Sequence, residues 1–552
     1  MRSSYREFFA QPRVYCALAL GAVLMAALGL RLWGIGFGLP YEYHVDEVQY
    51  VRQAATMGSQ GLEPVWWNNP PFYKYVLLAE YAALLGVGRV MGWYASAADF
   101  GAQHMTNAAT LYQLARATTA VFGTLTVCVI YWLGRIAYNR AVGLLSATFL
   151  GVCFLHVRDS HFAVNDVPAA FFTAVVLLAS VRVAQSGQRR WYVLAGVALG
   201  LGFATKYSAV LAALPLLVAH LFSPGFRLAK GARALGRLSL AFASAFGAAA
   251  LASPYFLLTP ANVLRDVRAL VLQGQYGFGD WQLDAAGGFV YYAKTLAWGI
   301  GIGLLLLAGI GVLVGLLHHR PQDIILAVFV LVSYAFWGRQ RMYFARFVIP
   351  LIPPLLVLAA SSVEHMARRL MHTSGKIGAG ICVAALALIA QPLSQSLRLG
   401  YLWTQTDTRT QAQQWIEQHL PRDTRIAVDW RTHCPPLSCE DQPSVASEYD
   451  TLIVGDYGLS EHPLDWYRKR GFNYLIATSY IYRIPLADPE EDASRRDFYT
   501  SLDRELTLAQ SFWPNASQTE PPFIWDEIYG PSIGLWQRER PGPVIKIYSV
   551  TP

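Results

Sequence analysis

Two adjacent acidic residues, Asp46 and Glu47, stand in the segment YHVDEVQYV (residues 43–51), shortly after the first long apolar run. Charges next to lipid are costly, so these carboxylates either mark where the chain leaves the membrane or perform chemistry. Two further acids, Asp159 and Asp166, lie between the third and fourth apolar runs. Carboxylates converging from neighbouring spans can act as a general base or hold a divalent cation. The alternative is that these acids are only solvated at the membrane interface. Asp166 would also be favourable at the N-terminus of a helix, where a negative charge is stabilised.

Few basic residues accompany these acids, so each of them is informative. Lys206 interrupts an apolar stretch in GFATKYSA, where a charge is by default a functional candidate. Arg346 directly precedes another apolar run, and Lys74 follows the segment NNPPFY. Lysine and arginine bind phosphates, arginine in a bidentate manner, although such side chains also reach out to lipid headgroups. The acids could activate an acceptor, and the cations could bind a phosphate at the same membrane face. This combination predicts transfer of a group from a phosphorylated lipid.

The composition indicates a polytopic α-helical membrane protein. Of 552 residues, 54% are hydrophobic and 14% are charged, whereas soluble domains carry about 25% charged residues. Several apolar runs approach the roughly 20 residues that span a bilayer. The eleven predicted spans are 14–36, 111–134, 141–157, 167–185, 191–204, 206–222, 237–257, 289–316, 323–337, 347–363 and 377–397.

The distribution of charge sets the predicted orientation. Basic loops alternate with acidic ones along the chain, and basic loops stay cytoplasmic. We therefore predict a multi-pass protein of the inner (plasma) membrane, with its N-terminus cytoplasmic and Asp46 on the outer face. This placement also explains the net charge of +8 without nucleic acid as a partner. The lipid bilayer is the expected surrounding.

The last part of the chain differs in character. We predict a membrane domain over residues 1–397 and an extracytoplasmic α/β domain over residues 398–552, because the tail is polar and contains short strand-like runs. Cys434 and Cys439 lie close together in this tail, and a disulfide between them is plausible outside the cytosol. The remaining cysteines lie in apolar runs, and none of the six has metal-site spacing.

Several ordered motifs resemble a known group of enzymes. VDEVQYVRQA, NNPPFYKYVLLAEYAALLG, the run from LYQLAR to ATFLGV and RDSHFAVNDVPAAFF follow one another along the membrane half. Together they resemble polyprenyl-phosphate-dependent glycosyltransferases of the GT-C superfold, and most of all the protein O-mannosyltransferase and aminoarabinose transferase group (glycosyltransferase family 39 and its kin). The tail resembles the outer domain of bacterial members.

The resemblance implies a function and roles for residues. It implies inverting transfer of a monosaccharide from a polyprenyl-phosphate carrier to a periplasmic acceptor, which is a protein, a lipid or a glycan. Asp46 matches the general base, Glu47 the second residue of the same motif, and Asp166 the second acidic position. Lys206 and Arg346 match cations near the carrier phosphate, and no metal or cofactor is expected.

One departure and two competing functions accompany this prediction. Aminoarabinose transferases usually have Lys-Pro-Pro in the first loop, whereas here Asn69 precedes the two prolines and the lysine is Lys74, which argues against an aminoarabinose assignment. Asp159 and His161 are candidates for supporting the site, although a structural role is the simpler expectation for His161. The alternatives are a transporter or flippase of lipid-linked glycans, or a non-catalytic binder of them. Charged groups at one face alone argue against transport.

Overall fold

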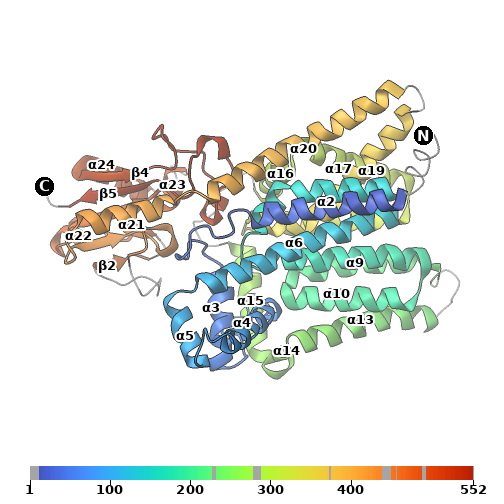
Figure 1. The fold of residues 1–552 in the computed structure, drawn as a ribbon, viewed down its shortest axis with the longest axis horizontal. Coiled ribbons are helices and arrows are strands. Elements are labelled where there is room, and N and C mark those ends of the chain that lie inside the picture. The colour runs from blue at the N-terminus through green and yellow to red at the C-terminus, as the bar shows by residue number, and fades with distance from the viewer. Residues whose placement is uncertain are drawn as a thin grey trace.

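The computed structural model describes residues 12–224, 226, 232–277, 287–371, 375–437, 449–455, 457–487 and 493–550. A bundle of long helices occupies one half of the molecule, and a small domain with a β-sheet occupies the other (Figure 1). Helix α2 (Pro12–Leu32) begins at the end of the bundle that is remote from the sheet domain. This arrangement agrees with an odd number of membrane crossings.

Each of the eleven predicted apolar runs coincides with helix. Six of the described helical stretches are long and apolar enough to cross a membrane, and a bent pair raises that number to seven; the count of eleven crossings stays a prediction. The bundle comprises α2, α6 (Ala109–Ala137), α7 (Arg140–Val152), α9 (Asp166–Ser186), α10 (Arg189–Thr205), η1 (Tyr207–Ala212), α11 (Ala213–Phe222), α13 (Ala232–Ala252), α16 (Gly287–Ile300), α17 (Ile302–His318), α18 (Pro321–Gly338), η2 (Ala345–Leu351), α19 (Ile352–Met371) and α20 (Gly375–Trp403).

Breaks interrupt several of the predicted spans, including the runs 289–316 and 141–157. The run 289–316 forms α16 and α17, which meet at a bend of 116°. Gly301 lies at that bend with φ +100°, a conformation that side chains disfavour, so a glycine is required there. The run 141–157 ends as a helix at Val152, and the short buried helix α8 (Phe154–Asp159) follows it. Hydrophobicity detects neither break, because both halves of each run are apolar.

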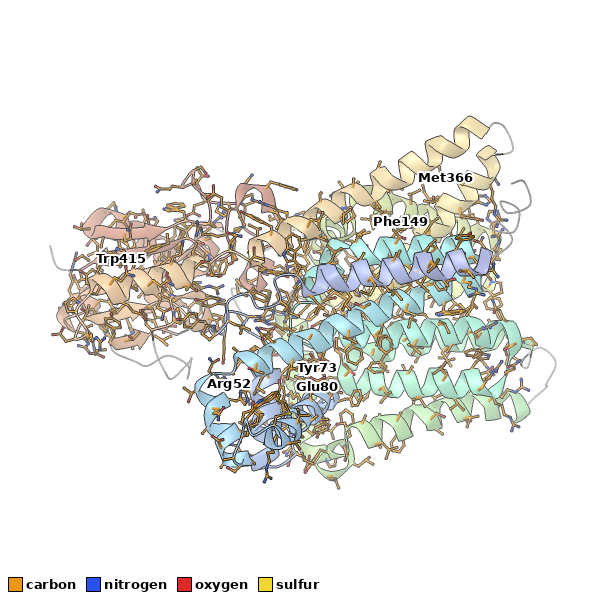
Figure 2. All side chains as sticks on the ribbon, viewed as in Figure 1. Arg52, Tyr73, Glu80, Phe149, Met366 and Trp415 are labelled. Carbon is orange, nitrogen blue, oxygen red and sulfur yellow. The ribbon has the colours of Figure 1, made fainter. Side chains whose placement is uncertain are left out.

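The long first loop is helical. It contains α3 (Val48–Gln60), α4 (Phe72–Val90) and α5 (Ala97–Thr106), which lie together at the end of the bundle nearest the sheet domain (Figure 1). Figure 2 shows Tyr73 in this region, whereas Met366 lies towards the opposite end. The Tyr73 hydroxyl donates to the Ala115 carbonyl oxygen at 3.1 Å, which joins α4 to α6. A second outer segment forms α14 (Tyr255–Leu258) and α15 (Pro260–Tyr276).

The tail forms the predicted α/β domain. Its five-stranded sheet has the order β2-β1-β3-β5-β4, with β1, β2 and β3 parallel and β5 antiparallel to both neighbours. The strand-like runs RIAVDW, DTLIVGD, NYLIATS and VIKIYSV contain β1, β2, β3 and β5, whereas β4 shows no clear alternation of apolar residues in the sequence. The elements are α21 (Thr408–His419), β1 (Arg425–Val428), η3 (Arg431–His433), β2 (Asp450–Ile453), η4 (Gly458–Glu461), α22 (Leu464–Lys469), β3 (Tyr474–Thr478), α23 (Ser479–Ala487), α24 (Ala493–Glu505), β4 (Thr507–Phe512), η5 (Trp525–Tyr529), η6 (Leu535–Gln537) and β5 (Ile545–Ser549).

The tail contributes residues to the hydrophobic core of the bundle. Helix α20 runs without a break to Trp403, six residues beyond the predicted boundary. Ile528 and Tyr529 of the tail are buried in the core of the helical bundle, and Leu535 is buried among residues of α3, α4 and α6. Cys434 is buried, and Cys439 lies outside the described residues, so their pairing stays a prediction.

Candidate active site

The two residues predicted as base and phosphate ligand lie in contact. Arg346 Nη1 is 2.7 Å from Asp46 Oδ2, and the two side chains are 17% and 20% exposed. Asp46 precedes α3 and Arg346 lies in η2, so 300 residues of chain separate them. Arg346 Nη1 is nevertheless buried without an aligned hydrogen bond to any of the described residues. Asp46 and Arg346 therefore attract each other as a charge pair without an aligned hydrogen bond.

A second ion pair adjoins the first. Lys206 Nζ donates to Asp166 Oδ1, and the lysine lies between α10 and η1, where the backbone is extended. Lys206 Nζ also lies 4.9 Å from the centroid of the Phe347 ring. Since Phe347 follows Arg346 directly in η2, Lys206 lies against the short helix that carries Arg346. Four predicted site residues from four separate segments of the chain thus come together.

Burial and neighbouring charges act on Asp46 in opposite directions. Burial raises the pKa of the Asp46 carboxyl, and the Arg346 guanidinium opposes this increase. Asp166 raises the pKa further, and Lys206 lowers it. A carboxylate whose pKa is raised, yet which stays partly exposed, is suited to accept a proton from a substrate.

The segment around Asn69 also reaches this cluster. Asn165 Nδ2 donates to Asn69 Oδ1 at 3.1 Å and to the Thr205 carbonyl oxygen at 2.6 Å. Asn165 precedes Asp166, and Thr205 precedes Lys206, so this amide joins the two segments that carry the second ion pair. Asn69, the residue that departs from the Lys-Pro-Pro pattern, is therefore in contact with the segments that form the site.

Glu47 points away from its neighbour Asp46. Its carboxylate is fully buried and accepts two bonds from Arg116, at 2.8 Å and 2.7 Å. The Ala163 N–H donates to the same carboxylate at 2.8 Å. Glu47 stands at the start of α3 without capping it through its side chain. Its oxygen atoms are engaged in joining α3, α6 and the segment after α8.

Lys74 lies beside the cluster, not within its ion pairs. It is buried in α4, and its Nζ donates to Gln53 Oε1 at 2.7 Å. Burial lowers the pKa of the Lys74 ammonium to about 8. The Tyr50 ring centroid is 5.8 Å from Nζ. Burial raises the pKa of the Tyr50 hydroxyl, and the charges of Asp166 and Asp46 raise it further. Tyr50 thus lies near Lys74 and within range of the charges of the two carboxylates.

The two supporting candidates are both buried. Asp159 pairs with Arg158 at 3.0 Å, and burial raises the pKa of this carboxyl to about 6. The two ring nitrogens of His161 face the carbonyl oxygens of Val157 and Trp33, at 2.8 Å and 3.1 Å. These contacts hold the ring in place, in keeping with the structural role expected for His161.

Sequence reasoning missed the contribution of the tail. The Tyr529 ring centroid is 4.5 Å from Arg346 Cζ and 5.4 Å from the centroid of the His44 ring. No local signal marks Tyr529 in the sequence. Arg116 and Arg158 were also missed, although they are charges within largely apolar stretches, which is the signal that identified Lys206.

The comparisons with known proteins agree with this architecture. Residues 110–258 match the family model of dolichyl-phosphate-mannose-protein mannosyltransferase. This segment carries Asp166 and Lys206. No curated protein sequence matches the chain.

Solved structures share the fold over most of the chain. The apo oligosaccharyltransferase of Archaeoglobus fulgidus matches with a TM-score of 0.57 and 13% identity, over 98% of this chain and 89% of that one. ArnT from Cupriavidus metallidurans, bound to undecaprenyl phosphate, matches with a TM-score of 0.51 and 16% identity, over 98% of both chains. A complex of the archaeal oligosaccharyltransferase AglB with an inhibitory peptide and a dolichol-phosphate gives 0.52 and 12%, over 92% and 74%. The chain therefore shares its fold with these solved membrane glycosyltransferases over most of its length, and residues 110–258 are similar to the mannosyltransferase family.

Proposed function

We propose that this protein transfers a monosaccharide from a polyprenyl-phosphate carrier to an acceptor on the outer face of the inner (plasma) membrane. The observation that carries the proposal is the contact between Asp46 and Arg346, with the Asp166–Lys206 pair beside it. These two pairs place a carboxylate base beside two cations at one membrane face. The ArnT structure contains undecaprenyl phosphate, and the AglB complex contains a dolichol-phosphate and a peptide, which supports a lipid-linked donor.

The proposed reaction is a single displacement at the anomeric carbon. The acceptor heteroatom forms a bond to this carbon while the bond from the carbon to the phosphate oxygen breaks. Asp46 accepts the proton of the acceptor, and the polyprenyl phosphate leaves with the bonding electrons. Arg346 and Lys206 stabilise the negative charge that develops on the leaving phosphate, where preorganised cations are most effective.

The other predicted residues receive distinct roles in this proposal. Asp166 holds Lys206 towards the carrier phosphate, and Lys74 offers a further cation when it is protonated. Glu47 positions Asp46 by fixing the start of α3 against Arg116, and it does not react itself. Asp159 supports the site from α8 through Arg158.

Replacement of Asp46 tests the assignment of the base. Asp46→Asn keeps the size of the side chain and removes its basicity, so we expect turnover to fall by about 10²–10⁴-fold with carrier binding retained. Label transfer from radioactive polyprenyl-phosphate mannose to membranes of a strain lacking the gene provides the measurement, with a panel of other labelled sugars run in parallel.

Asp99→Asn is the matched control, because Asp99 is an exposed acid of the same outer loop, in the first turn of α5, where its carboxylate accepts the backbone N–H of Ala95. We expect wild-type turnover from this variant. Full activity in Asp46→Asn would remove Asp46 from the mechanism. Carrier movement across vesicles without any label transfer would favour the transporter instead.

A further inference from the structure

The C-terminal domain reaches the proposed site through one short segment. Helix η5 and the residues after it leave the sheet domain and enter the helical bundle, where Ile528 and Tyr529 are buried in its core. The sequence predicts two separate domains, and it does not predict a segment of the tail that is buried in the bundle. The contacts of this segment show its role.

The segment is anchored to three membrane elements. Arg158 of α8 donates to the Asp526 carbonyl oxygen at 2.7 Å. The Asp526 carboxylate accepts the Tyr291 hydroxyl of α16 and, at 2.8 Å, the backbone N–H of Ala345 in η2. Since Ala345 precedes Arg346, the anchor fixes the backbone of the residue that meets Asp46.

The same segment is braced internally. Glu527 is fully buried and pairs with Arg538 at 2.8 Å. Its other oxygen accepts the backbone N–H groups of Ser532 and Ile533, at 2.9 Å and 2.8 Å. The tail therefore presents Tyr529 from a rigid loop, and a rigid loop is what positioning of a partner requires.

Tyr529 lies against the Arg346 guanidinium. Its ring centroid is 4.5 Å from Arg346 Cζ, and Phe344 lies at 4.3 Å from the same atom. Two aromatic rings thus hold the cation that meets Asp46. The hydroxyl contributes no charge, because burial raises the pKa of Tyr529 and keeps it protonated.

We propose that Tyr529 is a positioning residue of the transferase site, through which the C-terminal domain holds Arg346 in place for the carrier phosphate. This inference rests on the proposed function for the identity of the ligand. The contact itself rests on the geometry of Tyr529, Asp526 and Arg346. The C-terminal domain is accordingly part of the active site.

Binding of undecaprenyl phosphate to the purified full-length protein tests the proposal. We expect Tyr529→Ala to weaken binding about tenfold or more, because a desolvated cation–aromatic contact is lost. Tyr529→Phe keeps the ring and is expected to stay within about threefold of the wild type. Trp536→Ala is the matched control, since Trp536 is an exposed aromatic residue of the same tail segment, and wild-type binding is expected.

A double variant separates positioning from general loss of structure. If Tyr529 acts through Arg346, then Arg346→Ala with Tyr529→Ala binds no worse than Arg346→Ala alone. Fully additive losses, or wild-type binding by Tyr529→Ala, overturn the proposal. Failure of Tyr529→Phe to restore binding overturns it as well, because the ring would then not be the active part.

The wild type, Tyr529→Ala, Arg346→Ala and the double variant also decide the case in which the wild type does not bind undecaprenyl phosphate. Thermal unfolding without ligand then measures the coupling between Tyr529 and Arg346 directly. Coupling without carrier binding rejects the proposed function and keeps the positioning role. Absence of coupling rejects the positioning role whether or not the carrier binds.

Discussion

Neighbouring residues at the proposed site have opposite surroundings. Asp46 is partly exposed beside Arg346, whereas Glu47 is sealed against Arg116. The sequence identifies both as costly acids near a membrane span. Which of them faces the site depends on the turn of the backbone at the start of α3 and on where α6 and η2 lie.

Lys74 gives a prediction at the scale of one residue. Burial lowers the pKa of its ammonium to about 8, so the positive charge is present below that pH and is lost as the pH rises through it. A phosphate monoester is already doubly charged above about pH 7. If Lys74 serves the carrier phosphate, affinity for undecaprenyl phosphate falls between about pH 7 and pH 9.5, where an ordinary lysine would stay charged.

Lys74→Gln supplies the comparison for this titration. It is expected to bind more weakly at pH 7 and to lose the decline near pH 8. Titration by fluorescence or calorimetry at fixed ionic strength provides the measurement. Parallel pH curves for the two proteins would assign Lys74 a structural role with Gln53 alone.

At the scale of elements, one buried ion pair joins α3 to α6. Glu47→Gln leaves the Arg116 guanidinium buried without its counter-charge. Breaking one partner of a buried pair costs about 3–5 kcal/mol, so a large decrease in the unfolding temperature is expected. Thermal unfolding in detergent checks this value.

Arg368→Gln serves as the control for the ion-pair prediction. It breaks an exposed pair with Glu364 within α19, and exposed pairs contribute about 0–1 kcal/mol. We expect little change in its unfolding temperature. Equal effects of the two substitutions would contradict a bracing role for Glu47.

The interruptions of the helices show what hydrophobic runs leave open. The runs correctly locate helix along the bundle. The bend at Gly301 and the short helix α8 were not predicted, because the apolar composition of a run carries no information about the direction of its helix axis. Both depend on packing between helices that are distant in sequence.

At the scale of the whole molecule, Asp526 joins the two halves. Asp526→Ala removes the acceptor for Tyr291 and Ala345. We expect limited proteolysis at residues 404–407, between α20 and α21, to release the C-terminal domain several-fold faster than in the wild type. Mass spectrometry of the fragments over time provides the rate.

Asp503→Ala is the control for domain release. Asp503 lies on α24 and is half exposed, and it contacts Lys546 and Tyr548 within its own domain. Its removal is expected to leave the release rate near that of the wild type. If Asp526→Ala and Asp503→Ala release the domain equally fast, Asp526 does not hold the two halves together.

The sequence by itself determined the class of the protein, the helical runs, the α/β tail and the charged residues Asp46, Asp166, Lys206 and Arg346. These follow from local properties, namely apolar length, alternation and charge in apolar surroundings. Tertiary structure alone decided that Asp46 meets Arg346, that Glu47 is a brace and that Tyr529 enters the bundle. Such contacts join segments far apart in the sequence, from 69 residues between Glu47 and Arg116 to 300 between Asp46 and Arg346, and their geometry is set by the packing of the whole chain.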